Sequence, residues 1–131
     1  MRGMTIGQLA KAAGVGVETI RYYQRRGLMA VPPRPLGAAR RYPDETLARL
    51  AFIRRAQEMG FTLEEISSLI ELPPSDCVTG FGYAKAKHAE LGERIEALTR
   101  MRARLAGYIE RSVKRVDGAC PFLSALNGAG D

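Results

Sequence analysis

The chain has 131 residues and a hydrophobic fraction of 46%, which suits one domain of average size with a real core. No apolar run approaches the roughly 18 residues of a membrane span, and the N-terminus lacks a signal-peptide core, so we expect a cytoplasmic protein with no membrane partner. Two cysteines without a CxxC pair and the lack of a Gly-rich cofactor loop or paired acid and base argue against a thiol oxidoreductase or any other enzyme.

Basic charge is concentrated in the first 55 residues. This segment contains eleven basic and three acidic side chains, so its net charge is +8. Because the whole chain carries +6, the remainder carries −2. This asymmetry is typical of proteins that bind the phosphate backbone of nucleic acids. A basic face that contacts only solvent is the alternative.

Residues 5–28 predict two short helices joined by a glycine turn. Thr5 is placed as an N-cap, and Gln8 follows at the spacing of a capping box. Residues 14–16 (Gly-Val-Gly) form the turn, and Gly27 ends the second helix. This arrangement predicts a helix-turn-helix.

A wing and two further helices are predicted next. The Pro-rich residues 29–42 predict a short wing hairpin, and helices are expected over 46–59 and 63–72. The prolines at 73–74 mark a domain boundary. The predicted fold is mainly α: a winged helix-turn-helix DNA-binding domain over 1–74.

A heptad pattern runs from about Gly82 to Ser112 and predicts a coiled-coil helix. We divide the rest of the chain into a linker and dimerisation helix over 75–112 and an effector-binding loop and tail over 113–131. One such helix cannot bury its own apolar stripe, so a homodimer is expected, with packing on the same chain as the alternative. The predicted dimer seam consists of Leu91, Ile95, Leu98, Leu105 and Ile109.

The motifs together resemble one family. The stretch TIGQLAKAAGVGVETIRYYQRRGL, the wing ending RRY, the GFTLEEI segment and the long helix are similar to the MerR family of transcription regulators. The tail ACPFLSALNG resembles the end of the metal-binding loop in the mercury-responsive branch. The resemblance implies a homodimer of antiparallel long helices that binds double-stranded promoter DNA and distorts it when an effector binds, so that RNA polymerase can read the promoter.

Several side chains of the basic region are candidates for DNA contact. Arg21 is the first choice for a phosphate clamp because its guanidinium can bind a phosphate through two hydrogen bonds. For Tyr23 and Tyr42, the alternative to DNA contact is packing in the core. For Arg54, the alternative is a position on a face of its helix that contacts only solvent. The predicted DNA-binding residues are Thr19, Arg21, Tyr22, Tyr23, Arg40, Arg41, Tyr42 and Arg54.

The resemblance also implies a metal site at Cys77 and Cys120. Antiparallel pairing would bring Cys77 of one subunit near Cys120 of the other. The mercury-type pattern has a third thiolate before the second of these positions, and this chain has Arg111 or Ser112 there. Two thiolates suit a soft ion of low coordination number, for which mercury(II) is the best candidate, whereas zinc prefers four ligands.

The predicted function is therefore a metal-responsive regulator that activates resistance genes and has no organic cofactor. Another divalent ion (lead, cadmium or zinc) or oxidation of Cys120 is the alternative effector. His88, the one histidine, is expected on the coiled-coil seam rather than in a metal site. A coiled-coil adaptor that does not bind DNA would leave the basic region unexplained.

Overall fold

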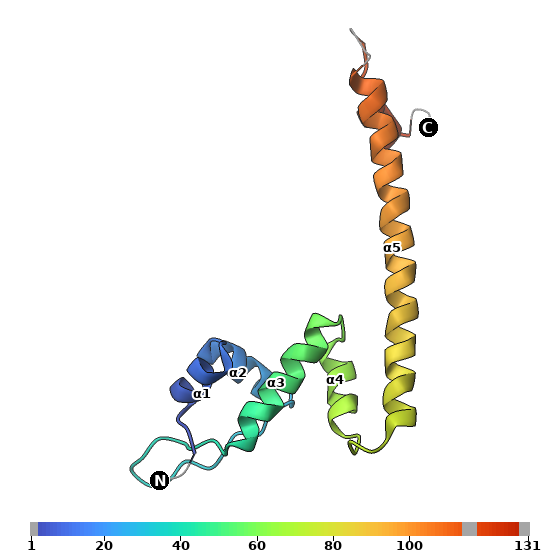
Figure 1. Cartoon of the computed structure of the whole chain (residues 1–131). Coiled ribbons are helices and arrows are strands. Elements are labelled where there is room, and N and C mark those ends of the chain that lie inside the picture. Colours follow the sequence, from blue (N-terminus) through green and yellow to red (C-terminus); the bar gives the residue numbers. More distant parts are fainter. Residues whose placement is uncertain (1–2, 114–117, 129–131) are drawn as a thin grey trace. The chain divides into compact units, whose positions relative to one another are not determined.

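The computed structural model describes residues 3–113 and 118–128 of the chain (Figure 1). The chain divides into two compact units, Met1–Tyr83 and Ala84–Asp131. The division into functional domains at 74 and 112 stays a prediction. The helices of the described residues are α1 (Ile6–Ala13), α2 (Val17–Arg25), α3 (Glu45–Glu58), α4 (Leu63–Ile70), α5 (Cys77–Val113) and α6 (Pro121–Leu126).

The helix-turn-helix forms as its capping residues predict. The Thr5 hydroxyl accepts a hydrogen bond from the Gln8 backbone N–H at 3.2 Å, and the Gln8 side chain accepts one from the Thr5 N–H at 2.9 Å. Gly14 ends α1 in the left-handed conformation with φ of 71°, which costs a residue without Cβ little. The predicted first helix, turn and second helix are confirmed.

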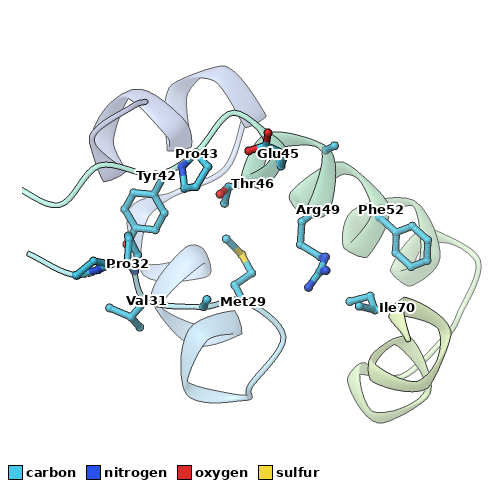
Figure 2. A pocket seen from close by; sticks show the side chains of 13 residues that line it. Met29, Val31, Pro32, Tyr42, Pro43, Glu45, Thr46, Arg49, Phe52 and Ile70 are labelled. Carbon is cyan, nitrogen blue, oxygen red and sulfur yellow. The ribbon is translucent and has the colours of Figure 1, made fainter. Parts of the chain in front are cut away.

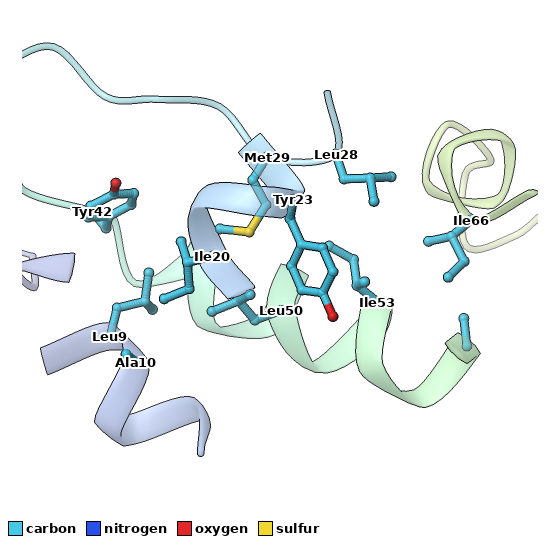
Figure 3. Packing of buried hydrophobic residues seen from close by; sticks show 11 residues of the cluster. Leu9, Ala10, Ile20, Tyr23, Leu28, Met29, Tyr42, Leu50, Ile53 and Ile66 are labelled. Carbon is cyan, nitrogen blue, oxygen red and sulfur yellow. The ribbon is translucent and has the colours of Figure 1, made fainter. Parts of the chain in front are cut away.

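The core of the first unit joins all four of its short helices. Leu9, Ile20, Leu50, Ile53 and Ile66 are completely buried, and each such side chain stabilises the fold by about 1.5–3 kcal/mol. Figure 3 shows the side chains from α1 and α2 meeting those of α3. The core therefore fixes α2 relative to α1 and α3.

The predicted wing hairpin is wrong in its detail. Residues 29–42 form a loop without a strand ladder, because its three prolines at positions 32, 33 and 35 have no N–H to donate. The bridge that does form joins Met4 to Tyr42, whose backbones exchange hydrogen bonds of 2.9 and 2.7 Å. We call residues 29–42 the wing loop.

The long helix α5 begins earlier than its heptad pattern predicts. Its first residue is Cys77, and not one near Gly82. The Asp76 carboxylate accepts a hydrogen bond from the Thr79 N–H at 3.2 Å and so caps the helix. The sequence pattern did not predict this start, because Gly80 and Gly82 lie in the first turns and glycine disfavours a helix by about 1 kcal/mol relative to alanine. Cys77 is thus the first residue of α5 and does not precede it.

A short helix, α6, begins at Pro121, because the fixed φ of proline suits the first turn of a helix. The predicted effector-binding loop and tail over 113–131 include residues 114–117 and 129–131, which lie outside the described residues. The helix α5 has 37 residues. Among the described helices, α5 included, none has an apolar stretch that could span a membrane.

Candidate functional site

The exposed face of α2 carries a basic-aromatic cluster around Tyr22. The Arg26 guanidinium donates a hydrogen bond of 2.7 Å to the Tyr22 hydroxyl. The guanidinium carbons of Arg25 and Arg26 lie 5.8 and 5.7 Å from the centre of the Tyr22 ring, within the range of a cation–π contact. Sequence reasoning missed both arginines, although their spacing of three and four from Tyr22 on a helix places them beside it.

A hollow of about 260 Å³ lies next to this face, between the start of α1, α2 and the wing loop. Three arginines from separate segments contribute to its wall: Arg21 from α2, and Arg34 and Arg40 from the two arms of the wing loop. Such a concentration of guanidinium groups suits a phosphate, which arginine binds with paired hydrogen bonds. Arg21 also forms an exposed ion pair with Glu18 at 3.1 Å. Arg34 was not predicted as a site residue.

Hydrogen bonds hold the wing loop in place beside α2. The Gln24 side-chain amide donates to the Tyr42 hydroxyl at 2.8 Å and to the Ala30 carbonyl at 3.5 Å. Within the loop, Arg40 Nε donates to the Pro32 carbonyl at 3.0 Å. These bonds connect both arms of the loop and so restrain the backbone that carries Arg34 and Arg40.

Tyr23 and Tyr42 lie in the core, and their contact with DNA stays a prediction. Their exposed fractions are 4% and 3%. The Tyr23 hydroxyl donates a hydrogen bond of 2.6 Å to the Gln57 side chain. Burial raises the pKa of Tyr23 above its ordinary value of 10.0, and the nearby charge of Arg54 opposes this rise. Both rings belong to the hydrophobic core of the first unit.

The other predicted DNA contacts take different positions. Arg54 Nη1 donates to the carbonyls of Ala13 and Gly14 at 3.2 and 3.3 Å. It therefore holds the end of α1 and the turn, which is a structural role. Arg41 is half-buried, and its Nε is buried without a hydrogen-bond partner among the described residues. Thr19 is half-buried on α2.

An open apolar pocket of about 640 Å³ lies where the wing loop meets α3 and α4. Figure 2 shows Val31 and Pro32 on one side of it, with Phe52 of α3 and Ile70 of α4 on the other. Arg49, also in its wall, donates a hydrogen bond of 3.1 Å to the Leu28 carbonyl. This pocket could not be predicted from the sequence, because its wall comes from three separate segments.

The two cysteines lie in different units. Cys77 is exposed at the start of α5, and Cys120 is half-buried directly before α6. The described residues contain no group of three or more His, Cys, Asp or Glu side chains that could hold a metal ion. As a donor set, two thiolates fit a soft ion that accepts two ligands, and they do not fit a four-coordinate zinc site.

The predicted seam of α5 is an exposed apolar stripe. The exposed fraction of its five residues ranges from 37% at Leu91 to 64% at Ile95, and Met101 beside them is also exposed. His88 is exposed as well. A stripe of this kind is typical of a helix that lacks its partner.

The fold and the basic-aromatic surface define a DNA-binding protein of the helix-turn-helix class. The family described as MerR HTH family regulatory protein matches residues 4–72, and the one described as MerR, DNA binding matches residues 47–108. A mercuric resistance operon regulatory protein of Pseudomonas fluorescens is 38% identical over 98% of this chain and 90% of its own length. The chain belongs to the MerR family of transcription regulators.

Solved structures agree with this assignment. A transcription regulator of Ralstonia metallidurans in complex with lead(II) has a TM-score of 0.81 and 32% identity, covering 94% of this chain and 98% of that one. The regulator MerR of Bacillus megaterium in complex with mercury(II) has a TM-score of 0.73 and 34% identity, covering 95% and 99%. The predicted family, the mainly helical fold class and the general function of a DNA-binding regulator are confirmed.

Proposed function

We propose that this chain is a mercury(II)-responsive transcription regulator that binds double-stranded promoter DNA as a homodimer and activates resistance genes. The observation that carries the DNA part is the hollow shared by Arg21, Arg34 and Arg40. A phosphate bound there would fix the position of α2 on the duplex, and Tyr22, Arg25 and Arg26 would then face the groove. Phosphate contacts position such a protein, and only a few side chains specify the sequence.

The dimer part rests on the exposed stripe of α5. Two copies that pair these stripes in antiparallel orientation would bury the predicted seam of Leu91, Ile95, Leu98, Leu105 and Ile109, which is otherwise exposed to water. Burial of apolar surface is the main driving force for such pairing. A dimer also presents two copies of α2, as two half-sites on DNA require.

The effector part rests on Cys77 and Cys120. In the proposed dimer, Cys77 of one subunit and Cys120 of the other bind mercury(II) between them as thiolates. Relatives named mercuric resistance operon regulatory protein and a mercury(II)-bound structural neighbour support this ion. Lead(II) is the second candidate, because a lead-bound regulator is also a structural neighbour.

The proposed switch acts through DNA shape. The metal would favour one arrangement of the dimer, and that arrangement would bend and untwist the promoter so that RNA polymerase can read it in the cytoplasm. Bending a DNA site of 20–30 base pairs by roughly 40–90° costs about 1–6 kcal/mol. Differential binding of an effector to two states supplies coupling of about 1–3 kcal/mol.

Mixed dimers test the proposed site. One subunit carries Cys77→Ser and the other Cys120→Ser, so each mixed dimer keeps one intact pair of thiols across its interface. We expect one mercury(II) ion per mixed dimer, detected by the charge-transfer absorbance of mercury–thiolate bonds. Dimers of the Cys77→Ser chain alone serve as the control and should bind weakly. A mixed dimer that binds no better than this control would show that the two cysteines do not pair across subunits.

A further inference from the structure

An aromatic contact joins the two helices of the C-terminal unit. The rings of Tyr108 on α5 and Phe122 on α6 have centroids 5.8 Å apart and are tilted by 57°. The guanidinium carbon of Arg111 lies 4.6 Å from the centre of the Tyr108 ring. We call Arg111, Tyr108 and Phe122 the clasp. Tilted ring pairs and arginine placed over a ring are both attractive arrangements.

The clasp matters because α6 is too short to be stable by itself. It has six residues, and isolated helices shorter than about 12 residues are marginal in water. Two of its apolar side chains, Leu123 and Leu126, are exposed at 56% and 69%, whereas Phe122 is half-buried. Phe122 is thus an anchor that holds α6 to the end of α5.

The anchored ring is two positions from the thiol of Cys120. The Cys120 carbonyl accepts a hydrogen bond of 2.9 Å from the Ser124 N–H and so belongs to the first turn of α6. Any contact that holds α6 in place therefore also restricts the backbone at Cys120.

We infer that the clasp is a positioning element that holds Cys120 ready for the effector before the effector binds. This inference rests on the proposed role of Cys120 as a ligand of mercury(II). Ordering a mobile segment opposes binding, and a site ordered in advance avoids that cost. This entropy cost matters more here than in a site with many donors, because only two metal–thiolate bonds would offset it. Arg111 covers the Tyr108 ring and supports the contact between the two rings.

The test uses the reduced full-length chain without metal. In a Cys77→Ser background, the rate of alkylation by iodoacetamide measures how often the Cys120 thiol becomes accessible to the reagent. Hydrogen exchange at the Ser124 and Asn127 amides, which donate within α6, measures opening of the helix. We expect Phe122→Ala and Tyr108→Ala to accelerate both by about 3- to 10-fold, the factor that corresponds to a typical aromatic pair.

Two variants separate the clasp from a general effect on α6. Tyr108→Phe keeps the ring, so both rates should equal those of the parent chain. Leu123→Ala removes an exposed side chain from the same helix, next to Phe122, and should change both rates by less than about 2-fold, since surface substitutions have small effects. If Phe122→Ala leaves both rates unchanged, or if Leu123→Ala changes them as strongly, the clasp has no positioning role.

Metal binding completes the test in the chain that keeps both cysteines. Phe122→Ala should weaken mercury(II) binding, measured by competition with a chelating thiol, by the factor by which it lowers the closed fraction of α6, because apparent affinity is proportional to the fraction of chains that are ready to bind. Tyr108→Phe should bind as the parent chain does. If the parent chain binds no mercury(II), the proposed function fails, yet alkylation and exchange still decide whether the clasp orders Cys120. If the closed fraction of α6 falls but affinity does not, the positioning role is refuted.

Discussion

At the residue scale, arginine serves two different purposes in the DNA-binding unit. Arg21, Arg34 and Arg40 line one hollow beside α2, where Arg21 also pairs with Glu18 and Arg40 also donates to the Pro32 carbonyl. Arg49 and Arg54 lie outside this hollow and hold the ends of local segments through hydrogen bonds to backbone carbonyls. A sequence shows the same guanidinium in both cases. The path of the backbone decides which arginines face outwards.

Replacement of Arg21 tests the phosphate hollow. Arg21→Ala should weaken binding to promoter DNA and reduce the slope of log affinity against log salt by about 0.9, the effect of one lost phosphate contact. The measurement is a gel-shift series at several salt concentrations. Arg100→Ala, which removes an exposed arginine of α5, is the matched control and should leave the slope unchanged. Equal slopes for Arg21→Ala and the parent chain would remove Arg21 from the interface.

The buried hydroxyl of Tyr23 predicts a dependence of stability on pH. Because burial raises its pKa in the folded state, stability is unaffected below pH 10 and falls above it, where the unfolded chain loses this proton first. Tyr23→Phe should remove that part of the fall. At pH 7 it should cost about 1 kcal/mol, because the hydrogen bond to Gln57 is lost. Urea unfolding at pH 7 and above pH 10 measures both effects, and an unchanged fall would contradict this account.

At the element scale, local signals predicted helices well and loops poorly. The predicted capping box at Thr5 forms in the structure, because a cap depends only on residues three apart. The start of α5 was missed since Gly80 and Gly82 weaken its pattern. The wing loop was assigned a hairpin because turn residues predict a reversal of the chain but not whether strands pair across it.

The seam of α5 can be broken by a single charge. Ile95→Asp should convert the proposed dimer to monomers, because it would place an unpaired carboxylate in the stripe that the dimer would bury, at a cost of several kcal/mol. Sedimentation at micromolar concentration measures the change. Arg100→Asp introduces the same side chain on the opposite side of the helix and should leave the dimer intact. A dimer that survives Ile95→Asp would show that the interface lies elsewhere.

At the scale of the whole molecule, the sequence predicts the class of protein more firmly than its sites. The charge of +8 over the first 55 residues and the helix-turn-helix pattern indicate DNA binding without any coordinates. The three-arginine hollow could not be predicted, because Arg34 reaches it only through the path of the wing loop. The metal site could not be established either, since the proposed pair of cysteines belongs to two subunits.

The most direct test is a titration of the reduced protein with mercury(II), lead(II), cadmium(II) and zinc(II). Thiolate charge-transfer absorbance reports binding, and a count of free thiols reports which cysteines are used. We predict tight binding of mercury(II) that consumes both Cys77 and Cys120, with a weak response to zinc(II), because two thiolates satisfy mercury(II) but leave zinc(II) without its full set of ligands. Tight binding of no ion, or mercury(II) binding that leaves both thiols free, would contradict the account.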